Sequence, residues 1–210
     1  LKPCATLYES YMVFLMTAYT PISQSKYFHV LKANHLWDIV LDEAKQVICT
    51  LAPFKKAIGN KCISEIMSKI FGQILATKAS ELFGVQVITT NCDNDPDIIF
   101  IEDGIKYSLE VKTAKCNETG YVNWRGGEFS KRDGDFFFVT WNWIDDNCDF
   151  DIFVAHTFVK KTNWKPSKKN YYAPTMPIEH LVIQENFMPF IGSMKLSKRG
   201  LPRVKLLNEN

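Results

Sequence analysis

Two carboxylates and one lysine stand at spacings that can bring them together. Asp97 opens an apolar run, and Glu110 and Lys112, two residues apart, end the next one. Between the runs stands Asp103-Gly104, and this dipeptide between alternating apolar residues predicts a two-residue type I′ hairpin turn. In that hairpin the strands pair so that Asp97 lies directly opposite Glu110. The three charged groups therefore meet at one end of the hairpin.

Alternation of side chains along both runs sorts the hairpin into two faces. One face is apolar and should pack on the core; it holds Ile98, Phe100, Ile105, Tyr107, Leu109 and Val111. The other face carries the three charged groups at one end and Ile99 and Ile101 further along. A shift of one residue in the register would scatter the charged groups, so their grouping depends on the turn.

This grouping of charges predicts a metal-dependent hydrolytic site. Two carboxylates this close repel each other, and a divalent cation is the common remedy. Hard oxygen ligands suit Mg²⁺, which keeps several waters and shares phosphate oxygens of its substrate. Such a metal assists attack on phosphorus, and Lys112 beside it could orient the attacking water or stabilise the developing charge. The alternative interpretation is a salt-bridged hairpin end.

Pro96-Asp97, a gap of twelve residues and then Glu110-Val111-Lys112 resemble the signature of the PD-(D/E)XK nucleases. The resemblance covers roughly residues 60–160 and implies the αβββαβ core of that superfamily. It also implies that Asp97, Glu110 and the Val111 carbonyl bind Mg²⁺, and that Lys112 assists the water.

Many members of this superfamily carry a further glutamate on the helix before the hairpin. Glu65 matches that role loosely, since it lies opposite the apolar stripe of the expected helix. The alternative is a solvated glutamate that is favoured by the helix N-terminus. Glu81 lies closer to the apolar stripe and is the weaker candidate. Asp95 is a candidate partner of Lys112 and is otherwise a turn residue.

Hydrophobic periodicity predicts the elements that must position this site. Residues 60–83 form the clearest helix, with a broad apolar stripe and Gly84 as its left-handed stop. Residues 1–58 are predicted to be helical, in segments 5–19 and 26–51, and a short helix is predicted at 178–185. The predicted strands are 85–90, 97–102, 105–112, 136–143 and 151–159. This order predicts an α/β (α+β) fold with a mixed β-sheet flanked by helices.

The chain of 210 residues is 46% hydrophobic and 13% aromatic, which suits one substantial core and excludes a disordered chain. We interpret residues 1–210 as a single domain with a helical N-terminal layer (1–58), a nuclease core (59–160) and a basic C-terminal segment (161–210).

Targeting signals and cysteine usage favour a cytoplasmic protein. No apolar run is long enough to span a membrane, and no signal peptide is recognisable. The sequence begins with Leu1 rather than Met, which is compatible with further residues upstream. Its six cysteines form no CxxC pair, and no His lies at zinc-finger spacing from them. We therefore expect reduced thiols.

The net charge of +2 conceals an uneven distribution. Residues 1–159 carry 15 Lys and Arg against 20 Asp and Glu, whereas residues 160–210 carry 10 against 3. An acidic body with a basic end favours a polyanionic partner, and a solvated tail is the alternative. Candidate DNA contacts are Trp124, Arg125, Ser130, Lys131 and Arg132 in the loop after the site, and Lys168, Lys169, Lys198 and Arg199 in the basic end. The alternative for the loop is an exposed charged segment.

The sequence therefore predicts a Mg²⁺-dependent endonuclease for double-stranded DNA, similar to the compact type II restriction enzymes of the superfamily. The resemblance implies a homodimer acting on palindromic DNA, with no membrane association and no nucleotide cofactor. A Holliday-junction resolvase or repair nuclease with the same core is one alternative, and a catalytically inactive DNA-binding module is another. His156 is expected to be a core histidine.

Overall fold

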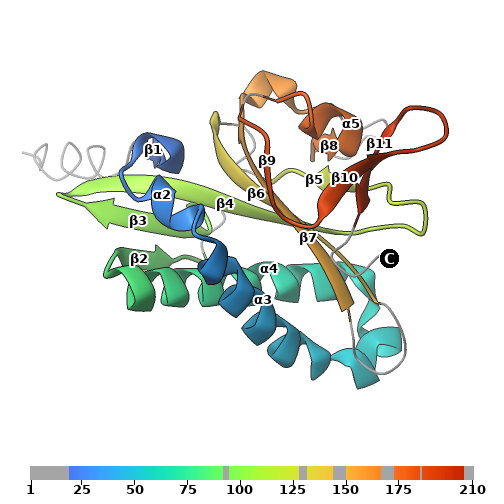
Figure 1. Cartoon of the computed structure of the whole chain (residues 1–210), viewed down its shortest axis with the longest axis horizontal. Coiled ribbons are helices and arrows are strands. Elements are labelled where there is room, and N and C mark those ends of the chain that lie inside the picture. The colour runs from blue at the N-terminus through green and yellow to red at the C-terminus, as the bar shows by residue number, and fades with distance from the viewer. Residues whose placement is uncertain are drawn as a thin grey trace, which may run out of the picture.

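A computed structural model describes residues 19–91, 95–127, 132–143, 150–166, 173–184 and 186–205. The protein has a mixed α+β fold in which helices flank a central mixed sheet, as the sequence predicts (Figure 1). The helices are η1 (Ile22–Gln24), α2 (Phe28–Leu31), α3 (Asn34–Cys49), η2 (Ala52–Phe54), α4 (Lys55–Phe83), η4 (Lys161–Asn163) and α5 (Ile178–Leu181). The strands are β1 (Thr20–Pro21), β2 (Gln86–Thr89), β3 (Ile98–Glu102), β4 (Ile105–Lys115), β5 (Asn123–Arg125), β6 (Gly134–Trp143), β7 (Phe150–Val159), β8 (Thr175–Pro177), β9 (Met188–Ile191), β10 (Ser193–Leu196) and β11 (Pro202–Lys205).

The main sheet has the strand order β2-β3-β4-β6-β7-β9, with β1 paired to β4 outside this path. Strands β2, β3 and β4 are antiparallel neighbours, and β6, β7 and β9 are too. The two groups join through the parallel pair β4–β6, which makes the sheet mixed. Strand β4 therefore lies at the centre of the sheet and carries the predicted site.

The predicted hairpin is confirmed in turn and register. Asp103 and Gly104 have φ values of 49° and 79°, as the two central residues of a type I′ turn require. The ladder runs from Glu102 opposite Ile105 to Ile98 opposite Leu109. Every apolar side chain assigned to the core face belongs to the core except Ile105, which lies beside the turn and is 47% exposed.

Helix α4 is the element that supports this hairpin. Its backbone is interrupted at Gly59, with φ 74° and ψ 157°, so its regular part begins at residue 60 as predicted. Its end is also as predicted: Gly84 has φ 65°, and its N–H donates to the Ser80 carbonyl at 2.9 Å. In Figure 1 the helix runs along one face of the sheet beside α3.

Two apolar clusters pack against the two faces of the sheet. The first joins α3 and α4 to β3, β4 and the odd-numbered residues of β6. The second joins the opposite side of β6 and β7 to β5, β8, α5 and β11. Phe136 and Phe138 face the second cluster, while Phe137 and Val139 face the first. This continuous apolar run identifies β6 as a strand buried on both faces.

The N-terminal region differs from the prediction of a wholly helical layer over residues 1–58. Thr20 and Pro21 form β1, a parallel neighbour of β4 at Tyr107 and Ser108. Strand β1 fits there because β6 begins to pair with β4 only at Glu110. The predicted helical segment 26–51 is broken into α2 and α3 around Lys32. The predicted segment 5–19 lies outside the described residues except for its last residue.

The connection from β4 to β6 also differs from expectation. The αβββαβ core implied by the resemblance has a helix here, but the described part of this connection, residues 116–127 and 132–133, contains only strand β5. β5 pairs with β8, far along the chain, and Gly126 N–H donates to the Pro174 carbonyl. The connection is thus held by the C-terminal elements instead of by helical hydrogen bonds.

The basic C-terminal segment is folded over its described length, so a solvated tail is the wrong interpretation for residues 173–184 and 186–205. β9 extends the main sheet beside β7, and β10 and β11 form a hairpin. Val204 in β11 is fully buried in the second apolar cluster. The predicted helix 178–185 shortens to the single turn of α5.

Cys49, Cys62 and Cys116 are not in disulfide bonds. Cys62 is exposed, whereas Cys116 is buried. None of the helices in the described part of the chain is long and apolar enough to cross a membrane.

Alanine substitutions at Gly72 in α4 and at Gly84, directly after its last residue, should change the stability of the protein in opposite directions. A Cβ at Gly72 would meet Ile98 and Val111 at ordinary contact distances of 3.8 and 3.9 Å, and alanine favours a helix interior by about 1 kcal/mol over glycine. Gly72→Ala is therefore expected to stabilise the protein by about 1 kcal/mol in urea unfolding. Gly84→Ala should destabilise it by about 1 kcal/mol, because its left-handed φ disfavours a Cβ. A destabilised Gly72→Ala variant would contradict this packing.

Candidate active site

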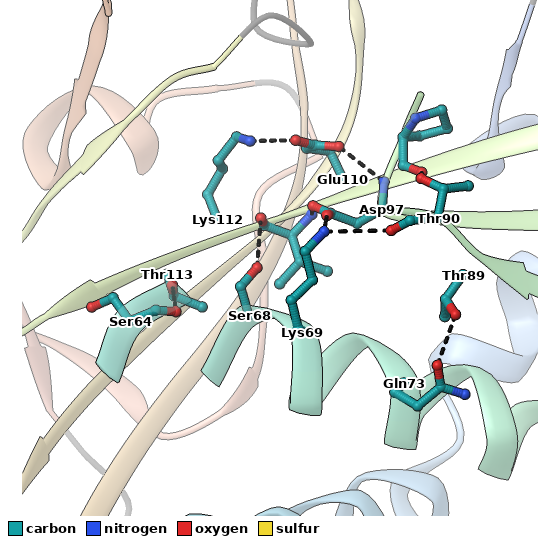
Figure 2. Close-up of polar contacts among 12 residues, drawn as sticks. Ser64, Ser68, Lys69, Gln73, Thr89, Thr90, Asp97, Glu110, Lys112 and Thr113 are labelled. Carbon is teal, nitrogen blue, oxygen red and sulfur yellow. Dashed lines mark hydrogen bonds and ion pairs between the residues drawn. The ribbon is translucent and has the colours of Figure 1, made fainter. Parts of the chain in front are cut away.

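The β3–β4 hairpin opens where the predicted site residues lie. The ladder ends at the pair Ile98 and Leu109, and Asp97 then takes over the pairing with its side chain. The Val111 N–H donates to Asp97 Oδ2 at 3.0 Å, and the Asp97 N–H donates to Glu110 Oε2 at 3.1 Å. Each carboxylate thus accepts a hydrogen bond from a backbone amide of the opposite arm of the hairpin, close to its predicted position (Figure 2).

Glu110 is a buried carboxylate, with only 6% of its surface exposed. Its Oε1 accepts a hydrogen bond from the Lys112 ammonium, whose side chain is 15% exposed. Burial raises the pKa of Glu110 to about 7; the positive charge of Lys112 opposes this rise, and the negative charge of Asp97 adds to it. The predicted trio of Asp97, Glu110 and Lys112 is thus a connected polar cluster.

Helix α4 docks on β4 through a seam of small polar side chains. Ser68 Oγ donates to the Val111 carbonyl at 3.3 Å, and Thr113 Oγ1 donates to the Ser64 carbonyl at 2.6 Å. Ser64 Oγ in turn accepts the indole N–H of Trp141 at 3.1 Å. Serines four residues apart share one helix face, so this spacing was a readable signal of close approach to the site.

Lys69 is a site residue that the sequence reasoning missed. Its ammonium lies 2.9 Å from Asp97 Oδ1 and 3.4 Å from the Thr90 carbonyl (Figure 2). It follows Glu65 by four residues and Ser68 by one, so helical periodicity puts it on the side of α4 that meets the hairpin.

The donor atoms predicted to bind a metal suit Mg²⁺ in their chemistry. They are the Asp97 and Glu110 carboxylates and the Val111 carbonyl, all hard oxygen ligands. Each now accepts a hydrogen bond from a serine or lysine side chain that can rotate away without moving the backbone. The described residues contain no group of three or more Asp, Glu, His or Cys side chains that could hold a metal ion.

A groove of about 640 Å³ opens beside this cluster, between α4, the end of β4 and β5. Its lining includes Lys112 and three further cationic side chains, Lys61, Lys115 and Arg125. Glu65 also lines it, with its side chain 65% exposed and 3.6 Å from the Lys61 ammonium. The structure brings Glu65 to the groove but pairs it with a surface lysine.

The structure contradicts one predicted DNA contact, whereas the next residue lines the groove. Trp124 is fully buried, and its indole N–H donates to the Val139 carbonyl at 3.0 Å, so it is a core residue and not a DNA contact. Its neighbour Arg125 points to the other side of β5, as strand alternation requires, and lines the groove. Arg132 is exposed next to β6.

The predicted DNA contacts of the basic C-terminal segment do not line this groove in the described part of the chain. Lys198 and Arg199 are exposed in the turn between β10 and β11 and are not among the residues that line the groove. The predicted contacts Ser130, Lys131, Lys168 and Lys169 lie outside the described residues. The DNA-binding roles of these residues stay predictions.

The glycine-rich loop after β5 does reach the site. A Cβ placed on Gly127 would lie 3.7 Å from the Lys112 ammonium, so the backbone at this residue lies close to that lysine. This proximity depends on the long-range pairing of β5 with β8.

Two other candidate residues have structural partners. Asp95 accepts a hydrogen bond from the Tyr19 hydroxyl at 2.7 Å, while Lys112 bonds to Glu110, so the suggested Asp95–Lys112 pairing is replaced. His156 is fully buried and lies 3.0 Å from Asp135 Oδ1, which confirms the expectation of a core histidine.

Comparison of the chain with known protein families gives no match, and comparison with curated proteins gives none either. Among solved structures, the chain is similar to a bacterial homing endonuclease, I-Ssp6803I, with a TM-score of 0.29 and 18% sequence identity. The alignment covers 53% of this chain and 72% of that one.

The raised pKa of Glu110 predicts a pH-dependent stability of the metal-free protein. A carboxyl group whose pKa is higher in the folded state stabilises the fold most below its unfolded value of 4.5, and this stabilisation is lost as the pH rises to about 7. The loss is on the order of 3 kcal/mol. Glu110→Gln should remove this pH-dependent component. In urea unfolding with EDTA present, the free energy of unfolding of the variant relative to that of the wild type should therefore be higher at pH 8 than at pH 5. Glu118→Gln, at an exposed position, is the control, and parallel pH profiles for wild type and Glu110→Gln would refute the assignment.

Proposed function

We propose that this protein is a Mg²⁺-dependent endonuclease that hydrolyses phosphodiester bonds of double-stranded DNA, most specifically as a type II restriction enzyme. The observation that carries the proposal is the cluster of Asp97, Glu110, the Val111 carbonyl and Lys112 where the β3–β4 hairpin opens. Three oxygen donors and one ammonium at the edge of a cationic groove suit the hydrolysis of a polyanion.

Each residue of the cluster has a distinct role in this proposal. The Asp97 and Glu110 carboxylates and the Val111 carbonyl would hold Mg²⁺, which supplies polarisation of the phosphodiester and stabilisation of its developing charge. Lys112, held beside Glu110, would orient the attacking water and stabilise negative charge on the phosphate. The water oxygen bonds to phosphorus, the phosphorus–oxygen bond to one nucleoside breaks, and the leaving oxygen takes up a proton.

The groove beside the cluster supports a nucleic acid as the substrate. Lys61, Lys115 and Arg125 come from three different elements and line one side of the site. Arg125 is an exposed guanidinium on β5, which can hold a phosphate with two hydrogen bonds. We therefore assign contacts with the DNA phosphates to this groove. The β10–β11 turn is a second candidate for such contacts.

A purely structural interpretation of the same residues competes with catalysis. Lys112 pairs with Glu110, and Lys69 pairs with Asp97, so the charges compensate each other within the chain. A structural network of this kind would not need a metal. Metal-dependent cleavage is therefore the property that separates the two interpretations.

Asp97→Ala and Lys112→Ala are expected to lower Mg²⁺-dependent cleavage by about 100-fold or more, because each removes a group that acts on the reacting phosphate. DNA binding, measured by fluorescence anisotropy in Ca²⁺, should survive in both variants. Lys106→Ala is the matched control, since it removes a lysine from the same face of β4 near the hairpin turn. Undiminished cleavage by either site variant would sink the site assignment.

The products of the wild-type digest separate the candidate activities. Discrete bands from a plasmid or phage genome support a restriction enzyme, and a homodimer would then give a palindromic cutting site. Cleavage of four-way junctions with intact linear duplex would instead support a resolvase. Binding without cleavage at any Mg²⁺ concentration would leave an inactive DNA-binding module.

The groove cations should contribute to DNA binding through phosphate contacts. Lys115→Ala and Arg125→Ala are each expected to weaken binding similarly for all sequences and to reduce the salt slope by about 1, provided each neutralises one phosphate. Binding isotherms at several NaCl concentrations measure this slope. Lys198→Ala tests the β10–β11 turn in the same assay, and Lys78→Ala, whose ammonium pairs with Glu43 and Glu81, is the control. Unchanged slopes for both groove variants would remove the groove from the DNA path.

A further inference from the structure

Helix α4 supplies a second lysine to the proposed catalytic cluster. The Lys69 ammonium lies 2.9 Å from Asp97 Oδ1, while the other oxygen of that carboxylate accepts the Val111 N–H at 3.0 Å. Lys69 also reaches the Thr90 carbonyl at 3.4 Å, so it bridges the end of β2 and the start of β3 (Figure 2). Both carboxylate oxygens of Asp97 therefore already accept a hydrogen bond from the chain.

The two carboxylates and the two lysines form a balanced set of charges. Lys112 compensates Glu110 on one side of the hairpin, and Lys69 compensates Asp97 on the other. A divalent cation that binds Asp97 would stand a few ångströms from the Lys69 ammonium. At that separation two like charges repel by more than 1 kcal/mol near a protein surface, so the cation and the Lys69 ammonium compete for the carboxylate.

The surroundings of Lys69 allow it to leave. Its side chain is 54% exposed, against 15% for Lys112, and both Lys69 and Asp97 line a second groove of about 440 Å³. The ammonium can therefore swing into solvent while its helix stays in place. Asp97 can be reached from the same groove, which gives a cation a route to it.

We propose that Lys69 is a placeholder cation: it occupies Asp97 until a divalent metal ion replaces it, and it thereby sets the metal concentration that the site requires. Lys69 is a positioning residue in this proposal and not a catalytic one. The inference rests on the proposed function, because it requires that Asp97 bind a metal. It adds that the metal must compete with a lysine of the chain itself.

Calcium binding by isothermal titration calorimetry tests the proposal without depending on cleavage. Removing the competing charge in Lys69→Met should tighten Ca²⁺ binding about tenfold, as expected for one partly screened charge near the ion. Lys69→Gln keeps a hydrogen-bond donor for Asp97 and Thr90 but loses the charge, and should tighten binding similarly. Lys69→Arg should bind as the wild type does.

Lys78→Met is the matched control, because Lys78 is also an ion-paired lysine of α4 but contacts Glu43 and Glu81. Its Ca²⁺ affinity should equal that of the wild type. Thermal unfolding gives a second readout: the increase in melting temperature on adding Ca²⁺ should be larger for Lys69→Gln than for wild type, even if the metal-free variant is less stable.

The outcomes separate this inference from the proposed function. If wild type and all variants bind no Ca²⁺ or Mg²⁺, the proposed metal-dependent function fails. If wild type binds and the Lys69→Met and Lys69→Gln variants bind equally or more weakly, Lys69 is a structural residue and the placeholder role is overturned. Tighter binding by both variants, with no change in Lys78→Met, supports it.

Discussion

The burial of Glu110 is the constraint around which the site is organised. A carboxylate that is 6% exposed is costly to ionise unless donors or cations surround it, and its pKa of about 7 reflects that cost. Two groups offset this cost, the Asp97 backbone amide and the Lys112 ammonium, whereas the negative charge of the Asp97 carboxylate, which is paired with Lys69, adds to it. Asp97 directly precedes β3, Lys112 lies in β4 and Lys69 lies in α4, so the hairpin and its helix must be correctly docked for the buried carboxylate to be tolerated.

The part of the site that lies within one hairpin could be predicted from local sequence. Asp103-Gly104 sets the turn, and strand pairing then places Asp97 against Glu110 with no further information. Helix α4 was equally accessible, because its apolar stripe and the stop at Gly84 are both local patterns. The buried run Phe136–Phe137–Phe138 likewise identified β6 from composition alone. In each case the signal and the structure it determines lie within about thirty residues.

Features that depend on distant pairing could not be predicted. Trp124 resembled a DNA contact because its neighbours are glycines and cations, but the pairing of β5 with β8 turns its indole into the second apolar cluster. Strands β9, β10 and β11 are four residues each, too short for alternation to identify them.

The way Asp97 ends the β3–β4 ladder restricts how this hairpin can vary among related chains. The site lies at the open end of the hairpin, where the Asp97 side chain accepts the hydrogen bond of the Val111 N–H in place of a backbone carbonyl. The turn lies at the other end and takes no part in the site. Lengthening both arms by one residue each moves the turn outward and leaves the carboxylates facing each other. Adding a residue to one arm alone turns one of them to the opposite face unless a bulge absorbs it. Insertions and deletions between the two carboxylates should therefore be inherited in even numbers, and a relative with an odd difference should carry a β-bulge.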